Sequence, residues 1–407
     1  MNIGIFTDTY FPQISGVAAS IATLDKELTA LGHNVYIFTS TDEAANKANE
    51  VGKVFRLPSF KSMFVPERRL AYSGVRTASQ LVRKLQIDVV HTHTEFSMGC
   101  LGKYLAKKYK LPFIHTYHTM YEDYVHYVAR GKLLTPYMVG KLTKWFCRGA
   151  DLVIAPTEKV KKTLKRYGVV AQISVVPTGI SLKQFKRTNQ TTQKTNALRE
   201  KLGFTVNDRI IVSIGRMAEE KNMQALVHAV KQGQAIKKPF QLVLVGDGPE
   251  RKKLETLTHS LGVTDFVHFV GAVDWKQIQY YYQLSNVFVS ASTTEAQGLT
   301  YIEAMASGCA VVAKADPSIE SIVQHEETGF VFQKDEDLAD VLQSIWANPD
   351  LLARIQENGN RHVKPLSAET FGRKLERVYF VQLRNQQYSE RYVRKQSSLF
   401  YRMRRSS

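Results

Sequence analysis

Two glutamates separated by seven residues, Glu295 and Glu303, stand in the segment TTEAQGLTYIEAMASGCAVV. Residues 299–306 follow a short apolar run and contain no helix breaker, so we expect Gly298 at the start of a helix. The free N–H groups and the dipole of a helix N-terminus attract an anion. Glu303, in the first turns of that helix, can accept hydrogen bonds from a diol such as a ribose, and Glu295 can reach another part of the same ligand. The alternative is a helix-capping glutamate beside a solvated one.

A second set of polar residues follows an apolar run in VSIGRMAEEKN. The expected strand ends at Gly215, and Arg216 and Lys221 follow within one loop and the opening of a helix. Two cations at the end of a strand can neutralise a diphosphate, which needs that neutralisation as it leaves a breaking bond. The alternative is a pair of surface cations bonded to Glu219 or Glu220.

The first half of the chain holds two further candidates. The N-terminal apolar run leads into TDTYFPQISGVAASI, where Gly16 opens a helix and would let backbone N–H groups approach a phosphate closely. This segment is no GxGxxG, so a dinucleotide fingerprint is absent. Farther on, FIHTYHTMYEDY places His115 and His118 at or beyond a strand end, and two histidines there indicate contact with a polar substrate. A structural role is the alternative.

Other catalytic and metal-binding patterns are missing from the sequence. Without a P-loop, a GxSxG segment or a CxxC pair, the sequence does not favour a kinase, an α/β-hydrolase or a thiol oxidoreductase. A metal site is conceivable where neighbouring strands end, but no HExxH or Cys/His spacing supports it. Its ligands would be His91, His93, Glu95, His115 and His118.

The elements that must position these residues alternate along the chain. Short apolar runs without polar alternation are separated by helical patterns, which is typical of parallel sheets covered on both faces. Open α/β sheets bind ligands beyond the carboxyl ends of their strands, so we predict an α/β fold of two doubly wound domains facing each other across a cleft. The expected strands are 3–6, 35–38, 54–57, 89–91, 113–115, 152–154, 173–176, 210–214, 242–245, 267–270, 287–289 and 310–312.

One polar stretch interrupts this alternation. Residues 188–196 contain no apolar side chain and are interpreted as a linker or surface loop, with the domain boundary near 178–194. We therefore expect an N-terminal Rossmann-like domain of residues 1–180 and a C-terminal one of residues 195–370. Residues 371–407 would form a helix, packing back across the N-terminal domain, and a basic tail.

Composition restricts the class of partner. The 407 residues are 44% hydrophobic and carry a net charge of +18, which implies a partner with phosphates: nucleic acid, an anionic membrane or a phosphorylated ligand. No apolar stretch reaches the roughly 18 residues of a membrane span, and MNIGIFTDTYFP lacks the basic start of a signal peptide. Three distant cysteines indicate a reducing compartment. They are Cys100, Cys147 and Cys309.

The segment 66–86 is the best candidate for a membrane contact. Its arginines recur every seven residues opposite an apolar stripe, which predicts an amphipathic helix, and FKSMFVPERR just before it mixes apolar and basic side chains. Further basic runs lie at 159–166 and in the tail from Arg384. The alternative is a core-facing helix with a solvated basic face. The residues assigned to membrane binding are Phe64, Arg68, Arg69, Arg76 and Arg83.

Taken together, these motifs resemble the retaining glycosyltransferases of family four, which have the GT-B fold. The resemblance covers nearly the whole chain, through FTDTYFPQISGV, HTYHT, the GR…EEKN loop, VGDGPE and STTEAQGLTYIEAMASG in family order. Among subgroups, the sequence is most similar to the bacterial enzymes that attach glucose from UDP-glucose to position 3 of diacylglycerol. Phosphatidylinositol mannosyltransferases are a more distant likeness.

The resemblance implies a role for each matching residue. His118 would lie by the transferred sugar, and the backbone of Val270 would meet the base. Gln297 stands where many relatives have Phe, so the donor contact made there is not carried over. The implied catalytic residues are His118, Arg216, Lys221 and Glu295. The implied donor-binding residues are Gly16, Arg216, Lys221, Val270, Glu295, Gly298, Leu299, Thr300 and Glu303.

The resemblance also implies an activity and a location. The N-terminal domain would receive a diacylglycerol acceptor and dock on the membrane, and the C-terminal domain would bind the nucleotide sugar. The α-monoglucosyldiacylglycerol formed with retention would serve glycolipid and lipoteichoic acid anchor synthesis. No metal is expected to be obligatory, although Mg²⁺ could stimulate the reaction. The protein would lie peripherally on the cytoplasmic face of the cell membrane. The alternatives are transfer of galactose or mannose, a soluble or polysaccharide acceptor, and a basic nucleic-acid-binding protein, for which we find no recognition motif.

Overall fold

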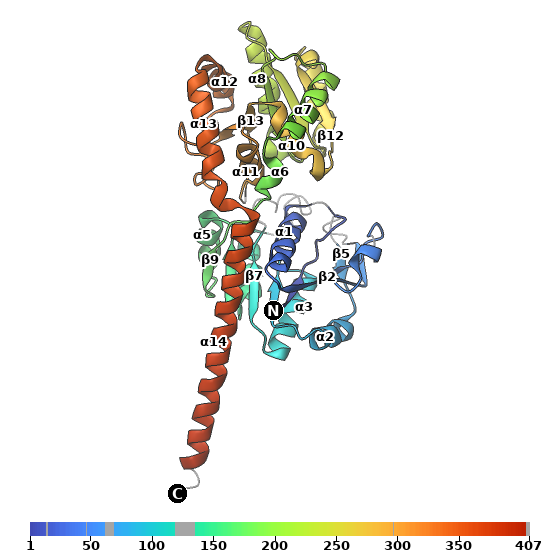
Figure 1. Ribbon diagram of the computed structural model, residues 1–407, viewed down its shortest axis with the longest axis vertical. Coiled ribbons are helices and arrows are strands. Elements are labelled where there is room, and N and C mark those ends of the chain that lie inside the picture. Colours follow the sequence, from blue (N-terminus) through green and yellow to red (C-terminus); the bar gives the residue numbers. More distant parts are fainter. Residues whose placement is uncertain (14, 46, 62–68, 119–134, 296, 404–407) are drawn as a thin grey trace. The chain divides into compact units, whose positions relative to one another are not determined.

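The computed structural model describes residues 1–13, 15–45, 47–61, 69–118, 135–295 and 297–403, with only the helix backbone described from residue 388 onward (Figure 1). The chain divides into two compact units. The first unit comprises Met1–Gly179 together with Ala368–Ser407, and the second comprises Ile180–Ser367.

The first unit is built on a seven-stranded parallel sheet in the order β3-β2-β1-β6-β7-β8-β9. Its central strands are buried throughout, which explains their near-continuous apolar sequences. All seven strands predicted for this half are confirmed. The strands are β1 (Asn2–Phe6), β2 (Asn34–Ser40), β3 (Val54–Leu57), β6 (Val89–Thr92), β7 (Phe113–Thr116), β8 (Leu152–Ala155) and β9 (Ile173–Val175).

Helices cover both faces of this sheet. One apolar core joins the sheet to α1 and to the first part of α14, and the other joins it to α2 and α3. The helix starts follow local sequence: Ser15 caps α1, and Thr135 caps α4 ahead of a proline in its first turn. The helices are α1 (Gly16–Ala30), α2 (Val75–Lys84), α3 (Ser97–Tyr109), α4 (Pro136–Cys147), α5 (Glu158–Arg166) and α14 (Ala368–Met403).

The long helix α14 returns the end of the chain to the first unit (Figure 1). Its residues Phe371, Leu375 and Tyr379 are buried in the core that α1 shares. His33 Nε2 and Glu376 Oε1 lie 2.8 Å apart and add a polar contact to this packing. The helix therefore packs on the N-terminal unit, as its sequence predicts.

The second unit has a six-stranded parallel sheet in the order β12-β11-β10-β13-β14-β15. The five strands predicted here are confirmed, and the edge strand β15 was missed because it is only three residues long. The strands are β10 (Ile210–Ile214), β11 (Gln241–Val245), β12 (Val267–Gly271), β13 (Val287–Ser290), β14 (Ala310–Lys314) and β15 (Phe330–Phe332). The helices are α6 (Leu182–Phe185), α7 (Asn189–Lys201), α8 (Met223–Ala235), α9 (Arg251–Ser260), α10 (Ile278–Leu284), α11 (Leu299–Ala306), α12 (Leu338–Ala347) and α13 (Pro349–His362).

The polar stretch interpreted as a linker is a helix, so that prediction was wrong. Thr188 and Thr191 form a reciprocal capping box at the start of α7, which lies against α10. Only Thr195 is buried along it. A helix with so little buried surface has no apolar periodicity by which its sequence could reveal it.

The predicted helix at 66–86 begins later than expected. Arg69–Ala71 forms β5, which pairs antiparallel with β4 (Ser59–Lys61), and α2 begins only at Val75. Gly74, with a φ of 97°, ends the extended segment at the start of the helix. Among the described residues, no helix combines the length and the apolar character that crossing a membrane requires.

Candidate active site

In the second unit, the backbones of the loops after β10 and β11 are in contact, since the N–H of Met217 donates to the carbonyl of Asp247 at 2.9 Å. Gly246 has a φ of 133°, and its N–H donates to the carbonyl of Gly271 at 2.9 Å. A Cβ added at Gly246 would lie 1.9 Å from the carbonyl oxygen of Gly215. Only glycine therefore fits at position 246. The glycine of this turn, residues 246–248, is required because the loop that carries Arg216 lies so close.

Lys221 and Glu295, predicted to touch different parts of one ligand, form an ion pair. Lys221 Nζ lies 2.6 Å from Glu295 Oε1 and 3.5 Å from Ser292 Oγ. The two segments are also joined through the backbone, since the N–H of Thr293 donates to the carbonyl of Glu220 at 3.2 Å. Both side chains keep some solvent exposure, 26% for Lys221 and 12% for Glu295, so a ligand can reach them. Arg216, in the loop after β10, is exposed.

The helix predicted after Gly298 is present as α11. Gly298 has a φ of 71°, and a Cβ there would lie 2.4 Å from the ring of Tyr301, so the position requires glycine. The backbone N–H groups of the first turn, those of Leu299 and Thr300 included, point out of the helix end. Together with Lys221 this places positive charge and amide dipoles in the same unit, which suits an anion.

Glu303 is enclosed within the second unit. Its Oε2 accepts a hydrogen bond from the hydroxyl of Tyr282 on α10 at 2.7 Å. Burial raises the pKa of Glu303 to about 7, while the Tyr282 hydrogen bond lowers it. The carboxyl thus engages the neighbouring helix rather than the N-terminus of its own helix, and it can accept hydrogen bonds from diol hydroxyls.

The structure also locates Val270, predicted to meet the base, and Gln297, for which no donor contact was carried over. Val270 lies on the edge strand β12 and is partly buried against the core. Gln297 is buried just before Gly298.

In the first unit, Gly16 begins α1 as predicted. Ser15 Oγ accepts the N–H of Ala18 at 3.1 Å, which fixes the start of the helix. A Cβ at Gly16 would meet no atom within 4 Å, so nothing in the described chain fills the space beside it. An anion can approach the α1 N-terminus there.

His118 is paired with a histidine that the sequence analysis considered only as a metal ligand. His93 Nδ1 and His118 Nε2 lie 2.8 Å apart, with the rings stacked at 5.1 Å. Burial lowers the pKa of His118 to about 4 and that of His93 well below its usual value, so both rings are neutral at pH 7. The HTHT repeat at the end of β6, beside β7, was the available signal for this pair.

The five candidate metal ligands fall into three separate hydrogen-bonded groups, one of which is the His93–His118 pair. His91 bonds to the hydroxyls of Tyr379 at 2.8 Å and Thr116 at 2.7 Å, and His115 Nε2 lies 3.1 Å from Glu95 Oε1. Within the described ranges, no group of three or more His, Cys, Asp or Glu side chains is arranged to hold a metal ion.

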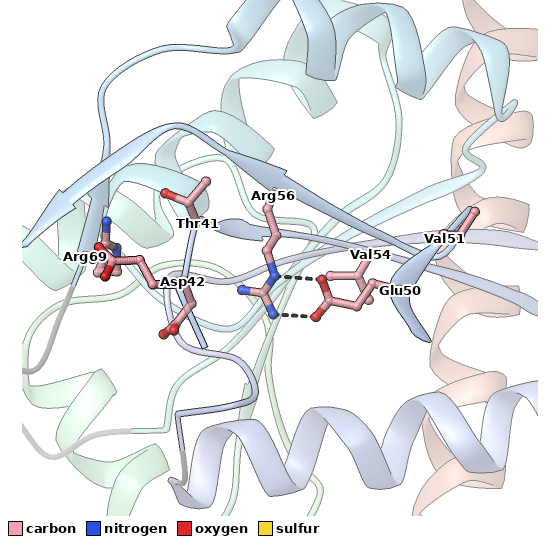
Figure 2. Close-up of a pocket in the computed structure, with 8 residues that line it drawn as sticks. Thr41, Asp42, Glu50, Val51, Val54, Arg56 and Arg69 are labelled. Atoms are coloured by element: carbon pink, nitrogen blue, oxygen red, sulfur yellow. Dashed lines mark hydrogen bonds and ion pairs between the residues drawn. The ribbon is translucent and has the colours of Figure 1, made fainter. Parts of the chain in front are cut away.

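A pocket that the sequence did not indicate lies in the first unit (Figure 2). Arg56 crosses it and donates to both carboxylate oxygens of Glu50, at 2.8 and 2.6 Å. An adjoining pocket lies beyond the carboxyl ends of β1 and β2. That edge of an open sheet is where a ligand is expected. Residues lining one or both pockets include Asp8, Tyr10, Thr41, Asp42, Glu43, Lys61 and Arg69.

The residues assigned to membrane binding are only partly brought together. Arg76 and Arg83 are exposed on α2, while Arg69 donates to Ser59 Oγ and to its carbonyl, both at 3.1 Å. Phe64 and Arg68 lie outside the described residues. The apolar stripe of α2 faces the core, so this helix matches the alternative of a core-facing helix with a basic outer face.

Both halves of the sequence match known protein families. The family described as "Glycosyltransferase Family 4" matches residues 14–184, and "Glycosyl transferases group 1" matches residues 194–362. The chain is 40% identical over 380 residues to alpha-monoglucosyldiacylglycerol synthase of Streptococcus pneumoniae, covering 93% of this chain and 85% of that protein. It is 34% identical over 390 residues to the synthase of the same name from Acholeplasma laidlawii, covering 93% and 96%.

The chain therefore belongs to the family-four glycosyltransferases, and it is a glycosyltransferase with the GT-B fold. Anabaena Alr3699/HepE in complex with UDP has the same fold, with a TM-score of 0.76 at 18% identity over 93% of this chain and 99% of that chain. Sucrose-phosphate synthase from Thermosynechococcus elongatus gives 0.75 at 24% identity, covering 93% and 98%.

Proposed function

We propose that this glycosyltransferase moves glucose from UDP-glucose to the 3-hydroxyl of 1,2-diacylglycerol, with retention at the anomeric carbon. The product, α-monoglucosyldiacylglycerol, would supply glycolipids and lipoteichoic acid anchors. The 40% identity to a synthase of this name along 93% of the chain carries the proposal of acceptor and sugar. The Lys221–Glu295 pair supports the donor chemistry.

The donor is held by the second unit. The diphosphate lies against Lys221, Arg216 and the N–H groups at the start of α11, so its charge is neutralised before and during bond cleavage. Lys221 Nζ then shares its hydrogen bonds between the diphosphate and Glu295, whose carboxylate accepts from sugar hydroxyls. Glu303 accepts from the ribose, and the backbone of Val270 meets the base.

The transfer itself needs little more than positioning and charge stabilisation. The bond from the anomeric carbon to the diphosphate oxygen breaks, and its electron pair leaves with UDP. The acceptor hydroxyl bonds to that carbon on the same face, and its proton passes to the departing diphosphate oxygen. No protein nucleophile is required, and the neutral ring of His118 contacts the transferred sugar.

We also propose a peripheral position on the cytoplasmic face of an anionic membrane, where the acceptor resides. The net charge of +18 supports this location because such a surface attracts polybasic proteins. No metal ion is obligatory in the scheme above, because fixed cations and amides take up the diphosphate charge, and Mg²⁺ can still stimulate.

The test is a transfer assay with radiolabelled UDP-glucose and UDP-galactose against diacylglycerol and monoglucosyl-diacylglycerol in detergent micelles. Chromatography should resolve one product, formed from UDP-glucose and diacylglycerol, and the proton coupling at its anomeric centre should be that of an α-glucoside. A β-glucoside, a galactolipid, or no lipid product despite UDP binding would overturn the assignment.

A further inference from the structure

Helix α4 has two apolar faces, of which the core uses only one. Residues Val139, Thr143 and Phe146 are buried against the first unit. The opposite side exposes four large apolar side chains, which we call the α4 face. They are Tyr137 (70% exposed), Met138 (45%), Leu142 (55%) and Trp145 (58%).

The α4 face forms a continuous strip along the helix. Met138, Leu142 and Trp145 are spaced i, i+4 and i+7, which places them one above another. Surface helices normally carry polar residues on the outward side, and apolar groups gathered there mark an interaction site. Helix α2 differs, because its buried residues face the core and Val75 is its one exposed large apolar side chain.

Cations surround the α4 face. Lys141 Nζ lies 4.5 Å from the ring centre of Tyr137, and Lys103 Nζ, from α3, lies 4.9 Å from that of Trp145. Neither α3 nor α4 contains an aspartate or glutamate. Tyr104 on α3 is also exposed, and its ring centre lies 5.9 Å from Lys108 Nζ. Apolar groups that insert and cations that stay at the surface are what an anionic membrane interface binds.

A basic pocket opens beside the end of α4. Lys103, Lys107, Lys110 and Arg148 line it, together with Asp151 and amide side chains of α14. Asp151 Oδ2 already accepts the N–H of Phe113 at 2.7 Å, so its charge is partly compensated by a fixed donor. Four cations around such a pocket suit a phosphate group.

We propose that the α4 face inserts into an anionic membrane while the basic pocket beside it holds a phospholipid headgroup phosphate. This deepens the proposed function, on which it rests, by naming the surface that brings the enzyme to its lipid acceptor. A second copy of the chain is a poorer occupant, because two α4 faces would bring their lysines together. The cations complement an anionic bilayer instead.

The surface is tested by flotation with vesicles of phosphatidylglycerol and phosphatidylcholine against vesicles of phosphatidylcholine alone. We expect wild-type protein to bind the anionic vesicles, and Met138→Ser/Leu142→Ser/Trp145→Ser to bind them at least about tenfold more weakly. The matched control is Val206→Ser/Ile236→Ser, which removes exposed apolar residues from the second unit and should leave vesicle binding unchanged. The urea unfolding midpoint should be the same for all three proteins, which verifies that the first unit with α4 remains folded. UDP affinity, measured by calorimetry, should also be unchanged and reports on the second unit.

A second measurement follows insertion directly. In a Trp275→Phe/Trp346→Phe background, Trp145 is the remaining tryptophan, and its fluorescence should be quenched by brominated phosphatidylglycerol. Lys103 is kept in the test of the pocket, because its ammonium donates to the carbonyls of Trp145 and Phe146 at the end of α4. Lys107→Gln/Arg148→Gln removes two other cations of the pocket and should weaken binding to anionic vesicles several-fold.

Three results would overturn the inference. The serine triple variant could bind anionic vesicles as strongly as wild type, or the fluorescence of Trp145 could remain unquenched. Sedimentation could also show that wild type is a dimer and that the triple variant is a monomer. Failure of the proposed function is distinguishable, because it would appear as absence of glucolipid in detergent micelles. Vesicle binding does not depend on that reaction.

Discussion

Replacing Lys221 with alanine removes the ammonium that lies 2.6 Å from Glu295 and that should face the leaving diphosphate. The lysine side chain is 26% exposed, so an intermediate effective dielectric applies. A unit charge about 4 Å from a phosphate oxygen then contributes about 4 kcal/mol at an effective dielectric of about 20. Loss of a fixed stabilising group of this kind typically costs about 3–4 kcal/mol of transition-state stabilisation, and Glu295 would remain beside the diphosphate without its cation.

At about 1.4 kcal/mol per tenfold, this corresponds to a kcat about 100- to 1000-fold lower. The assay is transfer of labelled glucose to diacylglycerol in micelles at saturating donor. Lys221→Arg keeps the charge and should recover part of the rate. Lys253→Ala is the matched control, because it removes an exposed lysine 2.7 Å from Glu250 and should leave turnover and stability unchanged. A Lys221→Ala enzyme within about threefold of wild-type kcat would refute the role assigned to the pair.

Other substitutions test the remaining parts of the site. Burial raises the pKa of Glu303 to about 7, so UDP affinity should increase as pH rises through that value, and Glu303→Gln should weaken binding and flatten the dependence in calorimetry. The folded state binds the Glu303 proton more tightly than the unfolded state does. Protonation of Glu303 therefore contributes its full stabilisation below about pH 4.5, and this contribution is lost as the pH rises through about 7. Urea unfolding of wild type and Glu303→Gln at several pH values would detect it. Gly298→Ala forces a Cβ to 2.4 Å from the Tyr301 ring at a φ of 71° and should lower the free energy of unfolding by about 1–3 kcal/mol. His93→Ala removes the hydrogen bond that orients His118, and kcat should fall about tenfold with UDP affinity unchanged; a proportional loss of both would indicate a structural defect.

The sequence by itself determined the class of fold and the order of its elements. Apolar runs such as 210–214 and 287–289 became buried parallel strands, because a strand covered on both faces must be apolar along its whole length. The helix after Gly298 followed from the apolar run before it and the absence of a breaker in residues 299–306, whereas the φ of 71° at Gly298 is known only from the structure. The start of α11 and the order of the family motifs were therefore predictable.

Elements stabilised by few apolar contacts escaped prediction. Helix α7 buries only Thr195 and is stabilised at its start by a capping box, so it lacks the periodicity that identifies a helix. The hairpin of β4 and β5 interrupts the arginine repeat, because pairing between Ser59–Lys61 and Arg69–Ala71 overrides local helical spacing.

Only the tertiary structure decided how the candidate residues meet. Lys221 and Glu295 are 74 positions apart in the sequence, and their 2.6 Å contact depends on how the chain returns between β10 and β13. The enclosure of Glu303 against Tyr282, and the stacking of His93 on His118, shift pKa values through burial. Residue types and spacing describe what each side chain can do, whereas burial and partners, which set its charge, arise from contacts between distant segments.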